Sequence, residues 1–190
     1  PGRSGRRFPG AVATGAPPEA LRADALGRDL GRRVADQELV RRHEREVFPL
    51  LHKRYLFSEV DNFYFYDFVT TEGYVDENVF VYSNRAGDEK AIVFYNNKFQ
   101  DTSGWIKHSL PKKMKKPNGE DKGMTSQSLA EALDLKNDGD YFTIFRDHKN
   151  NLQYIRNNKN LHEDGIFVSL GAFKYHVFLD FRQVEDRDNI

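Results

Sequence analysis

Residues 62–70 read Asn-Phe-Tyr-Phe-Tyr-Asp-Phe-Val-Thr, and this stretch decides the fold class of the chain. Aromatic and β-branched residues dominate it, as is typical of a strand, and its rings would lie on both faces. Residues 175–184 alternate with a period of two, which predicts a second strand with one apolar face. That apolar face would carry Tyr175, Val177, Leu179 and Phe181.

Further strands are expected between these two segments. Two pairs of short apolar runs flank turn-forming stretches and predict hairpins: residues 78–83 with 89–96, and residues 141–146 with 152–156. Two more strands are expected at residues 105–110 and 166–170. Seven or more short strands with little helix between them predict a mainly β fold, an antiparallel β-sandwich.

Helical signals are few. Asp36 is suited to be an N-cap, and apolar residues then recur at a helical period up to Pro49, which should kink or stop the helix. Ser128 and Glu131 have the spacing of a capping box, which predicts a short helix ending near residue 135. Residues 111–126 are polar and rich in turn formers, so we expect a loop there.

Composition changes sharply near residue 37. The first 37 residues hold one aromatic side chain, seven arginines and no lysine, whereas 24 of the 25 aromatic residues follow from Phe48 onward. A segment so poor in large side chains cannot offset the roughly 1–2 kcal/mol per residue that ordering its backbone costs. We therefore predict a disordered or loosely helical segment over residues 1–35, a helix over residues 36–57 and a β-sandwich domain over residues 58–190.

Charge and composition exclude several classes of protein. The 190 residues have a formal net charge of zero and contain no cysteine, so disulfides and thiolate metal sites are excluded. No apolar run is long enough to span a bilayer, and no cleavable secretory signal is visible, so we expect a cytoplasmic protein with no membrane partner. The six histidines lack the spacing of a zinc site, and we expect neither a metal nor a cofactor.

Motifs that would identify a reaction are missing from the sequence. It contains no Gly-x-Ser-x-Gly elbow, no phosphate loop and no dinucleotide-binding fingerprint. Spacing does not single out two of the 29 acidic residues as a carboxylate pair for glycoside hydrolysis. No residue is therefore predicted to be catalytic, and whether the chain is an enzyme stays open.

Two aromatic residues are candidates for binding carbohydrate. Trp105 follows Gly104 at the start of a short strand, where its flat ring could stack on a sugar; packing in the core or at its rim is the ordinary alternative. Tyr95 is the second candidate platform, with the same alternative.

One run of positive charge could bind phosphate. It consists of Lys112, Lys113, Lys115 and Lys116. A solvated loop is the alternative, because Asp101, Glu120 and Asp121 lie close by in the sequence and the residues after 37 are slightly acidic overall. We therefore do not expect nucleic acid as a partner.

Several stretches, taken in order, resemble a known pattern. Residues 47–57 (Val-Phe-Pro-Leu-Leu-His-Lys-Arg-Tyr-Leu-Phe) lead into residues 62–68, and the pattern continues through residues 77–97, 145–148, 152–156 and 175–182. Together they resemble the region that follows the catalytic barrel in large bacterial members of the α-amylase family of glycoside hydrolases. The resemblance covers about residues 36–184.

The resemblance implies a non-catalytic C-terminal β-sandwich fragment whose partner is the catalytic barrel of the parent enzyme, an enzyme that acts on α-glucans. No stretch here matches the catalytic motifs of the family, which implies an inactive chain. If the domain braces a barrel, residues 47–57 should expose an apolar patch. The alternatives are an independent carbohydrate-binding module that uses Trp105 and Tyr95, or a phosphate- or nucleic-acid-binding domain that uses Lys112 and the lysines after it.

Overall fold

The computed structural model describes residues 37–58, 60–115 and 121–187. Its contacts divide the chain into two compact units, residues 1–47 and residues 48–190. The predicted disordered or loosely helical segment over residues 1–35 lies outside the described residues. In the first unit, residues 37–46 are helical, and Arg42 and Glu46 form an ion pair of 3.1 Å one turn apart.

The second unit begins with α2 (Phe48–His52), followed by the 3-10 helix η1 (Arg54–Phe57). Pro49 lies in the first turn of α2, where its missing N–H costs no helical hydrogen bond. Leu56 of η1 is buried against Ala91 and Leu179 of the neighbouring sheet. The compact unit therefore starts with these helical turns, ten residues before the predicted start of the sandwich domain.

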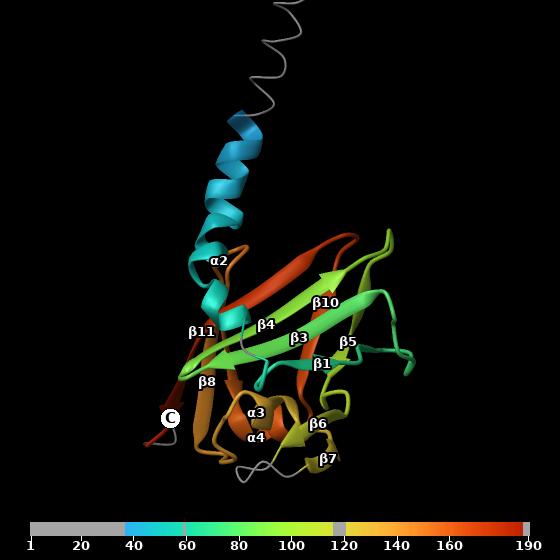
Figure 1. Ribbon diagram of the computed structural model, residues 1–190, viewed down its shortest axis with the longest axis vertical. Helices are drawn as coiled ribbons and strands as arrows, with labels where there is room; N and C mark the ends of the chain where they lie inside the picture. The colour runs from blue at the N-terminus through green and yellow to red at the C-terminus, as the bar shows by residue number, and fades with distance from the viewer. Residues whose placement is uncertain (1–36, 59, 116–120, 188–190) are drawn as a thin grey trace, which may run out of the picture. The chain divides into compact units, whose positions relative to one another are not determined.

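The larger layer of the second unit is a six-stranded antiparallel sheet in the order β1-β3-β4-β11-β8-β9 (Figure 1). Its strands are β1 (Tyr64–Tyr66), β3 (Val79–Ala86), β4 (Glu89–Asn96), β8 (Tyr141–Asp147), β9 (Gln153–Asn157) and β11 (Tyr175–Glu185). The β3–β4 and β8–β9 pairs confirm the two predicted hairpins. Gly87 occupies the tight β3–β4 turn with φ of +60°, a conformation that glycine adopts without strain.

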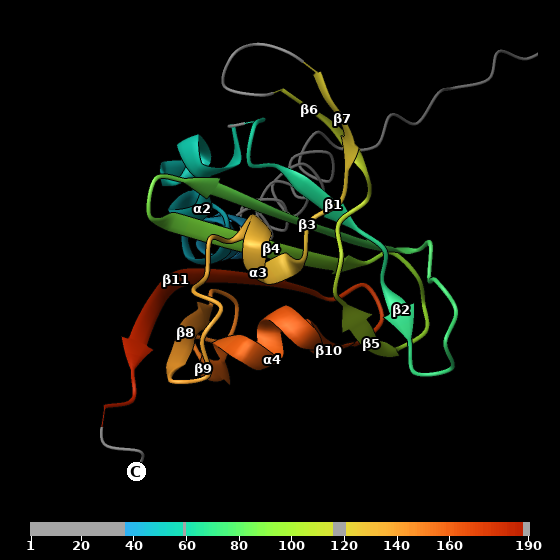
Figure 2. The same cartoon turned by 90° about the horizontal axis from the view of Figure 1, so that it is seen from below.

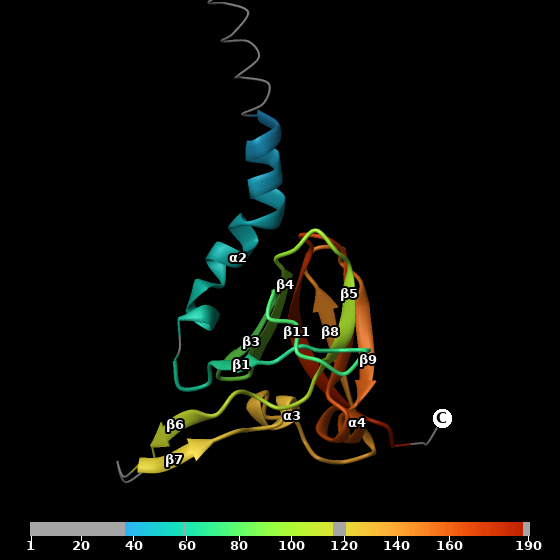
Figure 3. The same cartoon turned by 90° about the vertical axis from the view of Figure 1, so that its right-hand side faces the viewer.

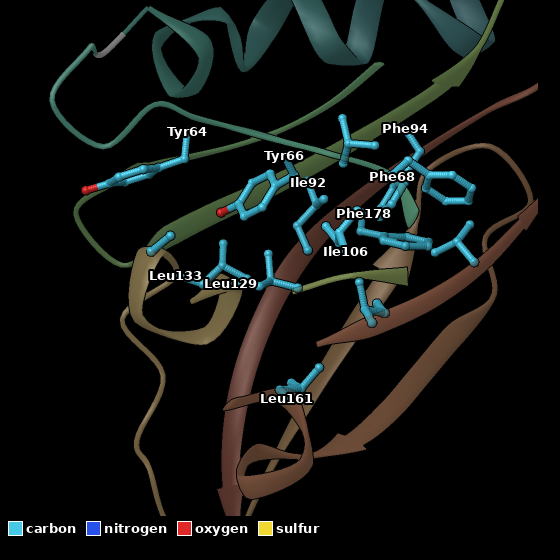
Figure 4. Close-up of a cluster of buried hydrophobic side chains, with 14 of the residues drawn as sticks. Tyr64, Tyr66, Phe68, Ile92, Phe94, Ile106, Leu129, Leu133, Leu161 and Phe178 are labelled. Atoms are coloured by element: carbon cyan, nitrogen blue, oxygen red, sulfur yellow. The ribbon is translucent and has the colours of Figure 1, made fainter. Parts of the chain in front are cut away.

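The smaller layer is a three-stranded antiparallel sheet in the order β10-β5-β2. Its strands are β2 (Val69–Thr70), β5 (Thr102–Ile106) and β10 (Ile166–Leu170). Figure 4 shows the core that the two sheets share, with Ile92 and Phe94 of the larger sheet near Ile106 of the smaller one. The predicted mainly β, antiparallel sandwich fold is confirmed.

Two short helices close one end of the core, α3 (Leu129–Ala132) and α4 (Asn158–Glu163) (Figure 2). The predicted capping box is present, because the Ser128 hydroxyl accepts a hydrogen bond from the Glu131 N–H and the Glu131 carboxylate accepts one from the Ser128 N–H. The sequence did not indicate α4. None of the helices in the described residues is both long and apolar enough to cross a membrane.

Several local predictions were wrong. The single strand expected at residues 62–70 is two short strands, β1 and β2, in different sheets, and the strand expected at residues 105–110 is β5, which ends at Ile106. Residues 111–126 are not simply a loop, since β6 (Lys112–Lys115) and β7 (Asp121–Thr125) pair as a hairpin that projects from the sheets (Figure 3). Phe181 does not share a face with Leu179, because one extra residue bulges between Leu179 and Arg182. Asp180 takes a φ of +56° at this bulge, and the ring of Phe181 stacks on Phe145 in the core.

Candidate functional site

Trp105 lies in the middle of the smaller sheet, on the face turned away from the core. Its register partners are Val69 on β2 and Phe167 on β10, and Val69 is bridged in turn to Val75. All four side chains are exposed, Trp105 by 40%, so they form one apolar row across the sheet, which we call the Trp105 row. The Trp105 and Phe167 ring centroids are 4.6 Å apart with planes tilted by 54°.

Gly104 explains why this strand can carry the row. A Cβ built on Gly104 would lie 2.2 Å from the backbone oxygen of Val69, well inside any permitted contact. Only glycine lets β2 approach β5 this closely, and β2 supplies Val69 to the row.

Polar groups adjoin the Trp105 row on the same face. Ser103, two residues before Trp105, donates or accepts a 2.8 Å hydrogen bond with the hydroxyl of Ser169. Ser103 also lines a polar pocket of about 310 Å³, together with Tyr74, Gln100 and other residues. The Trp105 row therefore lies beside hydroxyl, amide and carboxylate groups of this pocket. The remaining residues that line the pocket are Thr71, Glu72, Lys98, Asp101 and Thr102.

Tyr95 lies on the other sheet. It pairs with Phe80 on β3 and with Tyr175 on β11, and the Phe80 and Tyr95 rings stack with centroids 6.5 Å apart. Its hydroxyl donates a hydrogen bond of 3.3 Å to Asn97, and the residue is 36% exposed.

The structure does not bring the two predicted binding residues together. Ile106, next to Trp105, and Phe94, next to Tyr95, both face the shared core. Alternate residues of a strand point to opposite faces, so Trp105 and Tyr95 lie on the two opposite outer faces of the sandwich. One small ligand cannot touch both.

Sequence reasoning missed that Tyr95 belongs to a wider aromatic surface. Phe65 on β1 and Phe80 on β3 are 48% and 49% exposed on the same outer face, and half-buried Tyr82 lies between them in register. We call Phe65, Phe80, Tyr82 and Tyr95 the outer aromatic face; half-buried Tyr175, beside Tyr95, packs against the cluster around Leu56. The strand period could have revealed a second aromatic face, but not that Phe65, Phe80 and Tyr95 stay exposed on it.

The helical segment adds to this surface. Leu56 and its buried partners lie on the same outer face of the larger sheet, so α2 and η1 cover one end of that face. In this segment, Phe48, Leu51 and Tyr55 are exposed. The expected apolar patch therefore involves these three side chains, while Leu56 is buried beneath them.

A polar network fixes η1 to the sheet. Lys53 donates to Glu89 at 2.8 Å, Tyr55 donates to the other oxygen of Glu89, and Arg146 donates to Asp180 at 2.8 Å. The hydrogen bonds from Lys53 and Tyr55 lower the pKa of the Glu89 carboxyl. The network is an anchor rather than a reaction centre, since each charge already has a partner.

Five carboxyl groups in the described residues have a shifted pKa, and in each of them the pKa is lowered: Asp76, Glu89, Glu131, Asp147 and Asp180. Burial alone would raise the pKa of Asp147, but hydrogen bonds from His176 and the backbone N–H of Lys149 outweigh it. A general acid for glycoside hydrolysis needs a raised pKa instead. These five groups therefore act as paired structural carboxylates.

The lysine run has a structural role at its first member. Lys112 donates to the backbone carbonyls of Asp61 and Phe63, and its ammonium lies 3.9 Å from the centroid of the Tyr64 ring. Burial lowers its pKa, partly offset by Asp61. Lys112 thus anchors the β6–β7 hairpin and is not available to a phosphate. Within the described residues, no group of three or more His, Asp or Glu side chains could hold a metal ion.

No protein-family model matches this chain, and comparisons with curated proteins and with solved structures find no match either. Function must therefore be argued from the surfaces that the fold presents.

Proposed function

We propose that this chain is a non-catalytic β-sandwich domain of an α-amylase-family glycoside hydrolase, and that its outer aromatic face packs against the catalytic barrel of the parent enzyme. The outer aromatic face carries the proposal. A contiguous surface of large exposed rings is typical of an interface, because its contact with water is unfavourable until a partner covers it.

The composition of this surface suits a permanent interface. Aromatic side chains are enriched at interface cores and charged side chains are depleted there. Phe65, Phe80 and Tyr95 follow that rule, and the exposed Phe48 and Leu51 extend it along α2. The charged network of Lys53, Glu89 and Asp180 lies beside it, where a polar rim would be expected.

The experiment starts from the encoding gene. We expect the DNA upstream of the codon for Pro1 to encode an α-amylase-type barrel in frame. Co-expressed as a separate chain, that barrel should bind the present chain and elute with it in size-exclusion chromatography. Phe80→Ser combined with Tyr95→Ser should weaken the complex at least about tenfold, since central aromatic residues dominate interface energies.

Trp105→Ser is the matched control, because it removes an equally exposed ring from the opposite face of the sandwich. It should leave the complex with the barrel intact. A gene with no such barrel, or equal weakening by both changes, contradicts the proposal. The chain alone should not hydrolyse starch.

A second candidate function rests on the Trp105 row. Exposed rings beside hydroxyl, amide and carboxylate groups suit an α-glucan, whose sugar rings present C–H faces and hydroxyl edges. We infer that this face is an independent carbohydrate-binding site if the outer aromatic face has no barrel partner.

Titration with maltooligosaccharides tests the second candidate. Trp105 is the single tryptophan of the chain, so its fluorescence reports binding directly. A change that saturates below about 1 mM sugar, the weak end of specific affinities, is expected. A flat response in that range would reject the module, and Phe167→Ser should abolish any response that reflects stacking on the row.

A further inference from the structure

Strand β10 has an unusually unprotected edge. It is an end strand of its sheet, pairing only with β5, and residues 166–170 read Ile-Phe-Val-Ser-Leu. Edge strands are commonly protected by shortness, charge or proline. The edge strands β2 and β1 are two and three residues long, and β9 carries Arg156, whereas β10 has none of these features.

Register identifies the backbone groups at the free edge. The Thr71 N–H donates to the Ser103 carbonyl at 3.1 Å, so the backbone groups of Ser103 point toward β2. Because successive residues of a strand point their backbone groups to opposite edges, Gly104 and its alternate neighbours bond to β10. On β10, the N–H and C=O groups of Phe167 and Ser169 therefore face outward. No strand in the described residues forms hydrogen bonds with them.

A pocket of about 220 Å³ lies along this edge, between β10 and the larger sheet. Aromatic rings form much of its wall, with Phe145, Tyr154 and Phe178 packed on one another at centroid distances of 5.0–5.6 Å. Arg156 and His176 supply its charged and polar groups.

Arg156 brings one positive charge to the lining of this pocket. No acidic residue lines it, and Arg156 makes no ion pair in the described part of the chain. Buried Asp147 accepts a 2.7 Å hydrogen bond from Nδ1 of His176, which fixes the orientation of this ring in the pocket wall. An anion entering here would meet the Arg156 guanidinium, and no carboxylate lines the pocket to compete for it.

We propose that β10 accepts an extended peptide segment of a partner protein as an added strand, and that an acidic side chain of this segment enters the pocket toward Arg156. An added strand would supply hydrogen-bond partners for the outward N–H and C=O groups of Phe167 and Ser169, because its own backbone groups have the matching spacing. The apolar neighbours of the acidic residue would pack on the aromatic wall. This site is separate from the outer aromatic face and does not depend on a barrel partner.

Selection from a displayed library of random decapeptides tests the proposal on the full chain. We expect enriched peptides to be strand-forming, with one aspartate or glutamate between apolar residues. Binding of an enriched peptide, measured by fluorescence anisotropy, should fall about tenfold when its acid becomes the amide, and about tenfold in the Arg156→Gln protein. Arg182→Gln, which removes the same charge from an exposed position of β11 outside the pocket, should have no effect.

Hydrogen exchange gives an independent measurement. The amides of Phe167 and Ser169 should exchange rapidly in the free protein and become protected with peptide bound, whereas Val168 should be protected throughout. Enriched peptides without acids, binding that Arg156→Gln leaves unchanged, or failure to enrich any peptide overturns the proposal. Concentration-dependent protection of Phe167 and Ser169 without peptide also overturns it, because a second copy of the chain would then be the partner.

Discussion

At the scale of single residues, Gly104 shows how one missing side chain determines a surface. Its Cβ would lie 2.2 Å from the Val69 oxygen and 2.9 Å from the Phe68 ring. A backbone oxygen cannot move away without separating β2 from β5. The sequence marked Gly104 only as the neighbour of Trp105, since no pattern along a chain reveals how closely another strand approaches.

Gly104→Ala should therefore destabilise the protein by about 2–3 kcal/mol, the usual cost of overpacking. Gly139→Ala is the matched control, because the nearest atom to its new Cβ would be the Lys159 side chain at 3.9 Å. Urea unfolding followed through Trp105 fluorescence measures both. Equal stability of the two variants would contradict the tight approach of β2.

Asp147 is fully buried and accepts a hydrogen bond from Nδ1 of His176. The pKa of Asp147 is lowered in the folded state, so its carboxylate stabilises the fold above the unfolded-state pKa of about 3.9. That contribution disappears as the pH falls through the lower, folded-state pKa. Stability should consequently decline on acidification below about pH 4.

Asp147→Asn should remove about 2 kcal/mol at pH 7, as expected for hydrogen bonds to a buried charge, and should flatten the decline below pH 4. Glu163→Gln, at an exposed position of α4, is the control and should keep the wild-type profile. Thermal unfolding between pH 2.5 and 7 distinguishes them. An unchanged acid profile in Asp147→Asn would assign the pH dependence to other groups.

Among the elements, the β6–β7 hairpin is a polar stretch that one residue, Lys112, anchors to the rest of the domain. Lys112 bonds to carbonyls of the segment before β1 and lies over the Tyr64 ring, so the hairpin has a fixed base although its own sequence is polar and turn-rich. Sequence reasoning predicted a loop here because this anchoring joins residues about 50 positions apart.

Lys112→Ala should cost about 1–2 kcal/mol of stability through the lost hydrogen bonds and cation–π contact, while leaving retention on heparin unchanged. Lys107→Ala, at an exposed position of the same region, should affect neither measurement. A clear loss of heparin retention in Lys112→Ala alone would instead support the phosphate-binding alternative.

At the scale of the whole molecule, the boundary of the compact unit carries the sharpest prediction. Removal of residues 1–47 should leave the urea midpoint nearly unchanged, because the second unit begins at Phe48. Removal of residues 1–57 should cost at least about 3 kcal/mol, since Leu56 and the Lys53–Glu89 ion pair are lost and Ala91 and Leu179 are uncovered. Equal stability of the two truncated chains would support a domain that starts at residue 58.

The β3–β4 and β8–β9 hairpins were predictable because each is formed by neighbouring apolar runs around a turn-forming stretch. The turn at Gly87 and the capping box of Ser128 and Glu131 depend on contacts within a few residues, so the local sequence is enough to predict them. The bulge at Asp180 was not predictable, since a single extra residue in β11 depends on how β8 pairs with it. That bulge alone turned Phe181 from the predicted face to the core.

The mainly β, antiparallel structure with an aromatic core was predictable, because side-chain period and turn chemistry are properties of neighbouring residues. The placement of Trp105 and Tyr95 on opposite faces, the exposure of Phe65 and Phe80, and the open edge of β10 beside Arg156 emerged only with the packed sheets. These features depend on which sheet each strand joins and on what covers it. Such relations form between residues far apart in the chain, and no local pattern encodes them.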